Sequence, residues 1–473
     1  MSKDLATEII QTLRQRGSQA YLVGGCVRDL LLQREPADYD IATSATPALV
    51  MEVFPDSYGV GAQFGVVLVP LHPVDRAGPE RSRSVVEPPG GGLHNGKGNT
   101  IEVATFRSDH GYSDGRRPDE VRFSQHPQED VVRRDFTING MMLDPASGEV
   151  LDFVGGRDDL AAGIVRAIGD PAQRFAEDKL RMLRAVRFAA RFGFEIEAST
   201  FAAIERAAHE INVVSRERVR DELTKMLTEG HGRRAFLLLE ESGLLKGVLP
   251  EISAMKGVQQ PPEFHPEGDV FAHTLLLLEN LPTPCPSTLA WGALLHDVGK
   301  PATFRVAPDR IRFDNHVDVG VKIAEEICER LRFSNHDTAQ ILALVDNHMR
   351  FSHATRMNQS TLKKFLRMPA FDEHMALHRA DSLASHRNLS TYTFVQHKLA
   401  EIPPEKIRPK PLVTGDDLIA AGYTPGPEFR KILDAVENAQ LEGSLSSHET
   451  AMEFVKAKFP QDANGISSQV ASS

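Results

Sequence analysis

The sequence predicts an α+β protein, in which a small mixed β-sheet domain precedes mostly α-helical segments. Two observations indicate this class. Runs of residues typical of strands are confined to the part of the chain before about residue 150. From Pro171 onward apolar residues recur at helical spacing and strand signals disappear. The length of 473 residues corresponds to about three domains.

The N-terminal part is expected to alternate helices and strands. Residues 1–16 predict an amphipathic helix, and residues 20–25 a strand that ends on two glycines directly before another helix. Further strands are expected in YDIATSA, FGVVLVP and TIEVATF. Residues 70–100 are rich in Gly, Pro and charge and lack periodicity, so we expect a disordered surface insertion there.

Proline-rich stretches suggest the domain boundaries. We expect the N-terminal domain to cover 1–168 and a helical neck to cover 169–258. The segment QQPPEFHPEGD opens a histidine-rich helical domain over 259–401. A helical tail over 402–460 follows the stiff linker IPPEKIRPKP, and 461–473 should be disordered.

Composition excludes several classes of protein. No apolar stretch approaches the ~18 residues of a membrane-spanning helix, so no membrane association is expected. The acidic N-terminus does not resemble a secretory signal, and three scattered cysteines suit a reducing compartment, so we predict a cytoplasmic protein. A net charge of −11 argues against coating nucleic acid by bulk charge. No feature of the sequence indicates an oligomeric state.

Paired carboxylates suggest a metal site. Asp38 and Asp40 in PADYDIAT are two residues apart on an expected strand, so both would leave one face and could share divalent metal. Mg²⁺ prefers such oxygen ligands. Glu102 in TIEVATF would add a carboxylate from a neighbouring strand. A solvated turn for the pair, and an ordinary strand position for Glu102, are the alternatives.

A glycine turn lies just upstream. Gly24 and Gly25 end a strand before a helix, where backbone N–H groups can cradle a triphosphate. Arg28, one turn into that helix, adds a cation. With the carboxylates, this pattern predicts in-line phosphoryl transfer assisted by two metal ions.

The segment GGCVRDLLLQREPADYDIAT resembles the first motif of the class II tRNA nucleotidyltransferases and bacterial poly(A) polymerases, in the DNA polymerase β superfamily. The resemblance continues through ATFRSDHGYSDGRRP, RRDFTINGM, FAEDKLRMLRAVRFAARFGFEI and SRERVRDELTKML. It covers nearly all of residues 20–250 apart from the insertion. It implies template-independent addition of nucleotides to RNA 3′ ends, with Mg²⁺ at Asp38 and Asp40.

The resemblance also implies that EDKLR binds the incoming base. Asp178 and Arg181 are i and i+3 on one expected helix. Cytosine and adenine present an amino donor beside an unprotonated ring nitrogen, which a carboxylate and a guanidinium would select over uracil and guanine. Glu177 is expected to position Arg181. A simple surface salt bridge between Asp178 and Arg181 is the alternative.

Further nucleotide contacts are implied by the same resemblance. Asp135 and Asn139, i and i+4 if helical, would face the ribose, unless Asp135 merely caps a helix. Arg184 and Arg187 lie in a basic stretch that suits an RNA end or a triphosphate, or is a solvated face. The segment FRSDHGYSDGRRP resembles the flexible loop used in switching to adenine, and a plain solvated loop is the alternative. The loop residues are Arg107, Asp114, Arg116 and Arg117.

A second constellation lies in the histidine-rich domain. LLHDVGK, FAHT and HRADS together resemble the HD-domain phosphohydrolases, in which imidazoles and carboxylates hold a divalent metal. The residues implied are His273, His296, Asp297 and Asp381. His316 and His348 fall where two-metal members carry extra ligands, although core histidines are the alternative. An activated water there could hydrolyse phosphomonoesters or 2′,3′-cyclic phosphates at damaged RNA ends.

Our hypothesis is a tRNA nucleotidyltransferase that adds C, C and A from CTP and ATP, releases pyrophosphate, and carries an HD phosphohydrolase domain. The tail segment PLVTGDDLIAAGYTPGPEF resembles the C-terminal module of these enzymes, or is helix punctuation. Poly(A) polymerase and an enzyme that adds only A are rival functions. A hypothesis of another class is an HD metal phosphohydrolase with a non-catalytic RNA-binding head.

Overall fold

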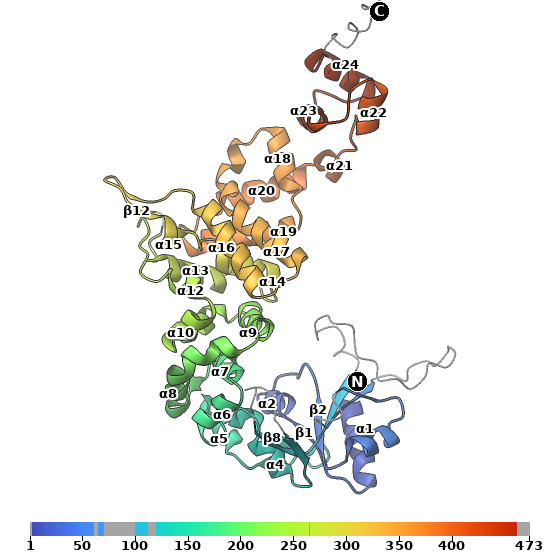
Figure 1. Ribbon diagram of the computed structural model, residues 1–473, viewed down its shortest axis with the longest axis vertical. Coiled ribbons are helices and arrows are strands. Elements are labelled where there is room, and N and C mark those ends of the chain that lie inside the picture. The colour runs from blue at the N-terminus through green and yellow to red at the C-terminus, as the bar shows by residue number, and fades with distance from the viewer. Residues whose placement is uncertain (1, 61–64, 71–99, 112–119, 264, 461–473) are drawn as a thin grey trace, which may run out of the picture. The chain divides into compact units, whose positions relative to one another are not determined.

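The computed structural model describes residues 2–60, 65–70, 100–111, 120–263 and 265–460. The chain divides into two compact units, Met1–Ser253 and Ala254–Ser473 (Figure 1). The predicted α+β class is confirmed, because the first unit contains a mixed sheet and the second is largely helical. The finer partition into head, neck, HD domain and tail stays a prediction. The segments predicted to be disordered lie, apart from their ends, outside the described residues.

A seven-stranded sheet forms the base of the first unit, in the order β3-β4-β5-β2-β1-β8-β9. Its strands are β1 (Ala20–Val23), β2 (Asp40–Thr43), β3 (Tyr58–Gly59), β4 (Val66–Pro70), β5 (Thr100–Thr105), β8 (Met141–Leu143) and β9 (Val150–Asp152). Among the described strands of this sheet, β2 and β5 are parallel and the other neighbours are antiparallel. The parallel pair occupies the centre, where buried strand residues such as Ile41 and Val103 fix its register.

Helices complete the first unit. They are α1 (Ser2–Gln15), α2 (Gly25–Leu31), α3 (Pro47–Val53), α4 (Pro127–Val132), α5 (Gly156–Ala162), α6 (Pro171–Glu177), α7 (Leu180–Phe192), α8 (Ala198–Ala207), α9 (Arg216–Thr228), α10 (Gly232–Glu241), α11 (Leu244–Val248) and α12 (Pro250–Ser253). The apolar stripe of α7 packs against α9 and α10.

The region expected to be entirely helical holds one short exception. Strand β11 (Glu195–Ile196) pairs in parallel with β10 (Ile164–Val165). A two-residue strand is too short to show any periodicity in a sequence, which explains the difference.

The second unit is built around α14. Its helices are α13 (Val270–Glu279), α14 (Ser287–Leu295), α15 (Lys300–Thr303), α16 (His316–Arg330), α17 (Asn335–Asn347), α18 (Gln359–Leu366), α19 (Phe371–Ala384), α20 (Ser390–Glu401), α21 (Pro404–Ile407), α22 (Gly415–Ala420), α23 (Pro427–Glu442) and α24 (His448–Lys458). Helix α14 is apolar on every side, so it is buried among α13, α17 and α19. His296 and Asp297 follow its last turn and are therefore placed inside the unit.

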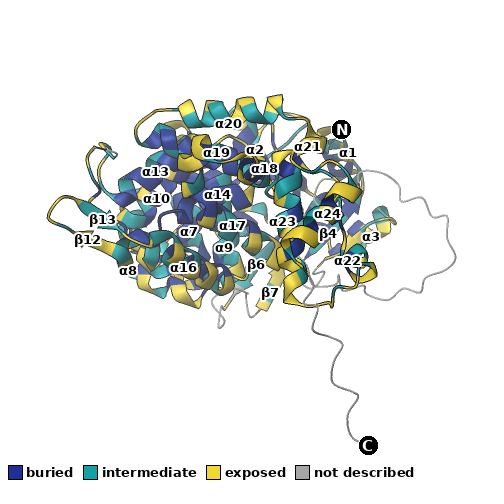
Figure 2. Ribbon diagram, turned by 90° about the horizontal axis from the view of Figure 1, so that it is seen from above, coloured by how far each residue is buried: buried dark blue, intermediate teal, exposed yellow. Residues whose placement is uncertain are grey.

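A hairpin interrupts the helices of the second unit, which the sequence did not predict. Strands β12 (Phe304–Val306) and β13 (Ile311–Phe313) are antiparallel, and the hairpin extends away from the neighbouring helices (Figures 1 and 2). Three-residue strands are too short for a clear alternation of apolar and polar residues.

The tail helices α22, α23 and α24 share a small core of their own. Within the second unit, α23 packs against α18, where Glu437 pairs with Lys364 and Arg367. Among the residues that the structure describes, no helix combines the length and apolar character of a membrane span.

Candidate active site and candidate metal centre

Two of the three predicted carboxylates, Asp40 and Glu102, lie in register on the central strands of the sheet. Asp40 opens β2 and is the register partner of Glu102 on the parallel strand β5, so both half-buried side chains leave the same face. Asp38 is exposed and precedes the strand, with the buried Tyr39 between the two aspartates. The prediction that Asp38 and Asp40 share a strand is therefore wrong for Asp38. Strand β1 ends at Val23 and leaves Asp38 without a partner strand on that side.

The glycine turn has the expected backbone geometry. Gly24 has φ +76°, a conformation that glycine adopts without strain, and it precedes the first residue of α2. Arg28 is only 4% exposed. Its guanidinium donates to Asn139 Oδ1 at 2.7 Å and to Asp29 Oδ1 at 2.8 Å. Burial lowers the pKa of Arg28 against the opposing effect of Asp29. In this structure Arg28 ties α2 to the segment before β8, and its contact with a phosphate stays a prediction.

Arg134 is the cation that the sequence analysis missed at this turn. Its Nη1 would lie 3.2 Å from a Cβ atom placed on Gly24. Arg134 also pairs with the buried Asp130 at 2.8 Å. Burial opposes its charge, but Asp130, Asp135 and Asp40 together raise the pKa of Arg134. The motif RRDFTINGM contained the signal, but nothing in the spacing showed which arginine faces the turn.

Asp135 and Asn139 lie together, although they are not on an α-helix as expected. Thr137–Asn139 forms a 3₁₀ turn, and Asn139 Nδ2 donates to Asp135 Oδ1 at 3.2 Å. Arg184 donates to Asp135 Oδ2 from Nε at 2.8 Å and pairs through Nη2 at 2.7 Å. Burial opposes ionisation, but Arg184 lowers the pKa of Asp135 to about 2. The helix-capping alternative does not apply either, because Asp135 accepts from the N–H of Phe136 instead.

Asp178 and Arg181 do not share one helix. Asp178 lies at the end of α6 with extended backbone dihedrals, whereas Arg181 lies in the first turn of α7. Asp178 Oδ1 accepts from the N–H of Leu180, and its Oδ2 pairs with Arg218 at 2.6 Å. The prediction of one helical face is wrong, because Asp178 terminates one helix and caps the next. The alternative of a mutual salt bridge is also absent, since both residues have other partners.

Arg181 is held by Glu177, at 2.6 Å, and donates to the carbonyl oxygen of Arg133 at 3.1 Å. This ion pair is the contact that the expected positioning role of Glu177 requires. Only 12% of the Arg181 side chain and 16% of the Asp178 side chain is exposed, so neither is turned outward into water.

The two predicted arginines of α7, Arg184 and Arg187, both approach one buried acid. Arg187 pairs with Glu222 at 2.6 Å, and Arg184 approaches the same carboxylate at 4.0 Å. Because Arg187 is only 6% exposed, its role in this structure is to join α7 to α9. Its predicted contact with nucleotide is not tested.

The predicted flexible loop begins in a two-stranded ribbon. Arg107 lies on β6 (Arg107–His110), which pairs with β7 (Glu120–Phe123), so Arg107 is not in a loop as expected. Asp109 of this ribbon pairs with Arg107 at 3.1 Å and with Arg133 at 3.5 Å. The ribbon thus adjoins the segment that contacts Arg181. The other predicted loop residues, Asp114, Arg116 and Arg117, lie outside the described residues.

The RRDFTIN segment therefore lies next to several of the groups that the predicted nucleotidyltransferase site requires. Arg134 lies against the glycine turn and interacts with Asp40, Asp135 holds Arg184, and the Arg133 carbonyl accepts from Arg181. Asp40 on the sheet and Arg181, predicted to read the base, thus both interact with this segment of the first unit. Such a site can hold Mg²⁺ on oxygen ligands next to cations for phosphates.

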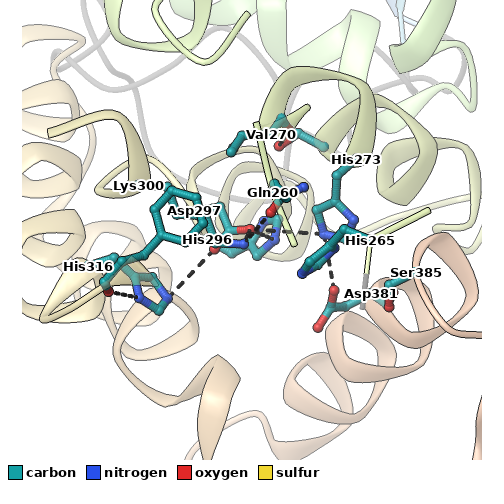
Figure 3. Close-up of polar contacts among 12 residues, drawn as sticks. Gln260, His265, Val270, His273, His296, Asp297, Lys300, His316, Asp381 and Ser385 are labelled. Atoms are coloured by element: carbon teal, nitrogen blue, oxygen red, sulfur yellow. Dashed lines mark hydrogen bonds and ion pairs between the residues drawn. The ribbon is translucent and has the colours of Figure 1, made fainter. Parts of the chain in front are cut away.

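The second unit brings together all six residues predicted to bind metal. His273 on α13 and Asp381 on α19 approach at 3.1 Å, and His296 Nε2 lies 3.1 Å from Asp297 Oδ2 (Figure 3). On the other side of Asp297, the Nε2 atoms of His316 and His348 each lie 3.8 Å from its Oδ1. Asp297 thus faces two sets of possible ligands, one through each oxygen.

The histidine rings are oriented as metal ligands require. Each Nδ1 is held by another group: His296 by Ala293 O, His316 by Phe313 O, His348 by Val345 O and His273 by Glu267 Oε1, at 2.7 to 2.9 Å. All four Nε2 atoms are buried; those of His316 and His348 lie 3.8 Å from Asp297, beyond hydrogen-bond distance, whereas those of His273 and His296 face carboxylates at 3.1 Å. Burial lowers the pKa of His348 to about 4, which keeps that ring neutral. Buried nitrogens without partners fit a cation between them, and the outer contacts fix the tautomers.

The sequence analysis overlooked Lys300 and the pair His265 and Glu267 in this centre. Lys300 Nζ contacts Asp297 at 2.7 Å and Gln260 at 2.7 Å. Glu267 accepts from His265 and His273 at 2.8 and 2.7 Å. The ligands open onto a cavity of about 520 Å³ that His265 and Lys300 also line. The HxE and HDVGK patterns were present, but spacing did not show that they share one cavity.

Comparison with known proteins places these features in one family. Models described as "Poly A polymerase head domain", "Probable RNA and SrmB- binding site of polymerase A" and "HD domain" match residues 20–76 and 87–166, 193–256, and 270–385. The CCA-adding enzyme of Lactobacillus delbrueckii subsp. bulgaricus (ATCC 11842) is 37% identical over 294 residues, 60% of this chain and 67% of the relative.

Two further relatives show how far the likeness extends. The Geobacillus sp. (WCH70) enzyme is 43% identical over 239 residues, 50% of this chain and 53% of that protein. The chain thus spans about half the length of the curated relatives it matches first. The CCA-adding enzyme of Bacillus cytotoxicus is 28% identical across 94% of this chain and 96% of its own.

Solved structures agree in fold. The Bacillus stearothermophilus CCA-adding enzyme in complex with CTP matches with a TM-score of 0.70 and 27% identity, over 96% of this chain and 97% of that one. The Thermotoga maritima CCA-adding enzyme complexed with tRNA shares the fold, with a TM-score of 0.56 and 20% identity over 96% of this chain and 95% of that one.

Proposed function

Because the chain belongs to the CCA-adding enzyme family, we propose that it adds C, C and A to tRNA 3′ ends, using CTP and ATP and releasing pyrophosphate. The family predicted from the sequence motifs is confirmed by the comparisons. The substrates are inferred from relatives of this name and from the residues of the first unit. The predicted cytoplasmic location is consistent with this function.

The single observation that carries the proposal is the placement of Asp40 and Glu102 in register on parallel strands, beside Arg134 and the glycine turn. These carboxylates, with Asp38, would hold Mg²⁺, whose charge when bound supports phosphoryl transfer. The turn amides and Arg134 would bind the triphosphate. The tRNA 3′-hydroxyl would then attack the α-phosphorus in line as its bond to pyrophosphate breaks.

The base would be read by Asp178 and Arg181, each fixed by an ion pair. Arg218 orients the Asp178 carboxylate, and Glu177 orients the Arg181 guanidinium. A pre-oriented acceptor and donor select cytosine and adenine because uracil or guanine would leave both groups mispaired. Asp135 and Asn139 are placed beside Arg184 and would contact the ribose.

Nucleotide addition to tRNA that lacks its 3′ end tests the proposal against its rivals. We expect incorporation of labelled C followed by A, with none from UTP or GTP. Long A tails would indicate a poly(A) polymerase, and a single A only on tRNA ending in CC would indicate an A-adding enzyme. No incorporation at all would favour the hydrolase with a non-catalytic RNA-binding head.

We propose metal-dependent hydrolysis of phosphate esters as a second function, located in the second unit. The observation that favours it is the set of three buried Nε2 atoms, of His296, His316 and His348, around Asp297 at the wall of a cavity. His273, His296, Asp297 and Asp381 would hold one divalent ion, and His316 and His348 with Asp297 a second. When bound, such ions would activate water for attack on a phosphomonoester or a 2′,3′-cyclic phosphate.

Hydrolysis should be assayed with adenosine 2′-phosphate and 2′,3′-cyclic AMP after the protein is stripped and reloaded with Mg²⁺, Mn²⁺, Co²⁺ or Ni²⁺ in turn. Phosphate release that requires an added metal and is lost in Asp297→Asn would support the function. Absence of release with all four metals would exclude it for these substrates.

A further inference from the structure

The hairpin β12–β13 has one face that is entirely apolar. The register pairs are Phe304 with Phe313 and Val306 with Ile311, so these four side chains leave the same face of the ribbon. Arg305 and its partner Arg312 occupy the opposite face. A two-stranded ribbon has no second layer of its own, so an apolar face on it requires an explanation.

This apolar face is exposed to solvent, although few of the described large apolar side chains of the second unit are exposed. In the described part of residues 254–473, the large apolar side chains that are exposed are Phe304 (41%), Val306 (71%), Met349 (46%) and Ile419 (52%). Two of these belong to the ribbon face, and Met349 lines the metal-centre cavity. The exposed apolar surface of this unit is therefore concentrated beside the candidate metal centre.

The ribbon is also attached directly to that centre. Ile311 and Phe313 of the apolar face line the cavity that the ligands open onto. The carbonyl oxygen of Phe313 accepts from Nδ1 of His316, and Lys300 Nζ lies 5.3 Å from the centre of the Phe313 ring. A planar group stacked on this face would hence lie next to the side chains expected to meet a phosphate.

We propose that the apolar face of β12–β13 is a stacking platform for the terminal bases of single-stranded RNA whose 3′ end enters the metal-centre cavity. This assignment rests on the proposed hydrolase function of the second unit and names its substrate class. Two phenylalanines whose ring centroids lie 6.0 Å apart offer π-faces for bases. Lys300 and Arg310 at the cavity wall offer charge for the phosphates. Aromatic rings next to cations are the combination that binds single strands without sequence preference.

The combination distinguishes RNA from a protein partner. An apolar protein segment would bind to the ribbon face alone. It would not require the candidate metal ligands and the cations at the end of that face. A bare phosphate ester would be satisfied by the cavity alone and would leave Phe304 and Val306 unused. A nucleic acid end uses both, because its bases are apolar planes and its termini carry phosphate.

The test compares two substrates in the full-length, metal-loaded protein. One is a short single-stranded RNA that ends in a 2′,3′-cyclic phosphate, and the other is glycerol 2-phosphate, which has no base. For Phe304→Ala combined with Val306→Ala, we expect KM for the RNA to rise roughly 5- to 100-fold, the range for losing base stacking. Hydrolysis of glycerol 2-phosphate should be unchanged. Arg305→Ala, on the opposite exposed face of the same ribbon, is the matched control and should leave both substrates unaffected.

Several outcomes would overturn the assignment. An equal loss on both substrates would mean that the ribbon only supports the metal centre, and an unchanged KM for RNA would mean that it binds no base. Photocrosslinking of RNA with a 3′-terminal 4-thiouridine provides a readout that needs no hydrolysis. Adducts within residues 304–313 support the platform even if the wild-type protein hydrolyses neither substrate. Such a lack of hydrolysis would refute only the proposed hydrolase function. Adducts found only elsewhere would refute the platform.

Discussion

The two candidate sites differ in how their charged groups are satisfied before any ligand binds. In the first unit, the groups predicted to bind the nucleotide already have ionic partners: Asp178 has Arg218, Arg181 has Glu177, and Asp135 has Arg184. In the second unit, the Nε2 atoms of His296, His316 and His348 surround Asp297, and those of His316 and His348 lie 3.8 Å from it, beyond hydrogen-bond distance. The first arrangement keeps side chains in fixed orientations for a polar ligand. The second is complete only with a cation.

This contrast teaches what each site needs from solution. A network of satisfied ion pairs contributes to the stability of the apo protein, and its ligand brings new partners to groups that are already oriented. A cluster of buried, unpartnered nitrogens costs stability until a metal binds, because desolvated polar atoms are left unpaired. Four variants test this difference between the two sites, and they are given in order of decreasing effect.

The largest effect is expected for Asp40→Ala. Loss of this carboxylate should reduce the rate of nucleotide addition by about 10³-fold or more, because the metal that stabilises the transferring phosphoryl group loses a ligand. Phosphate-ester hydrolysis by the second unit should be unchanged in the same preparation. Glu52→Ala, an exposed acid of the same unit, is the control for charge. Retained addition would contradict the metal assignment, and a parallel loss of hydrolysis would mean that the two sites are not independent.

Asp297→Asn should produce the converse result. Because Asp297 faces both sets of ligands, we expect metal affinity, measured by calorimetry on stripped protein, to fall roughly 100-fold. Addition of metal should raise the unfolding temperature of the wild-type protein but not that of the variant. Asp318→Asn, exposed on α16, serves as the control. If metal stabilised Asp297→Asn as strongly as wild type, the six residues would not be the metal site.

Asp178→Asn tests whether the pre-oriented acid reads the base. An amide can donate to the O4 of uracil, which the carboxylate cannot, so the preference for CTP over UTP should fall by roughly 100-fold. The measurement is the ratio of kcat/KM for the two nucleotides on tRNA that lacks its 3′ end. Asp221→Asn, a partly exposed acid on α9 that pairs with Arg220, is the matched control. An unchanged preference would show that Asp178 is a helix cap and nothing more.

The smallest effect concerns stability of the ion-pair network. The pKa of Asp135 is lowered to about 2 in the folded protein, below the value of about 3.9 in an unfolded chain. Ionised Asp135 therefore contributes about 2 kcal/mol to the free energy of unfolding above pH 4. This contribution is lost as the pH falls from about 4 towards 2. The difference in unfolding free energy between wild type and Asp135→Asn should therefore shrink over this range, as measured by urea titration. Asp158→Asn, an exposed acid, should show no such trend, and a difference independent of pH would argue against the Arg184 pair.

Much of the candidate sites followed from local sequence. The D-x-D carboxylates, the glycine pair and the adjacent His296 and Asp297 are close in the chain, and short-range geometry brings such residues together in almost any fold that contains them. The change from a sheet-containing region to helical segments was also predictable, since the change from strand-like runs to helical spacing is a property of consecutive residues.

Partners distant in the chain were not predictable in the same way. Arg218 meets Asp178 from another helix, Arg134 joins Arg28 at the glycine turn, and Phe313 of an unexpected hairpin supports His316. The sequence by itself determined which chemical groups are present and which of them are neighbours along the backbone. Only the tertiary structure decided which charges neutralise each other and which nitrogens are left facing Asp297, because those contacts depend on how whole helices pack and not on residue spacing.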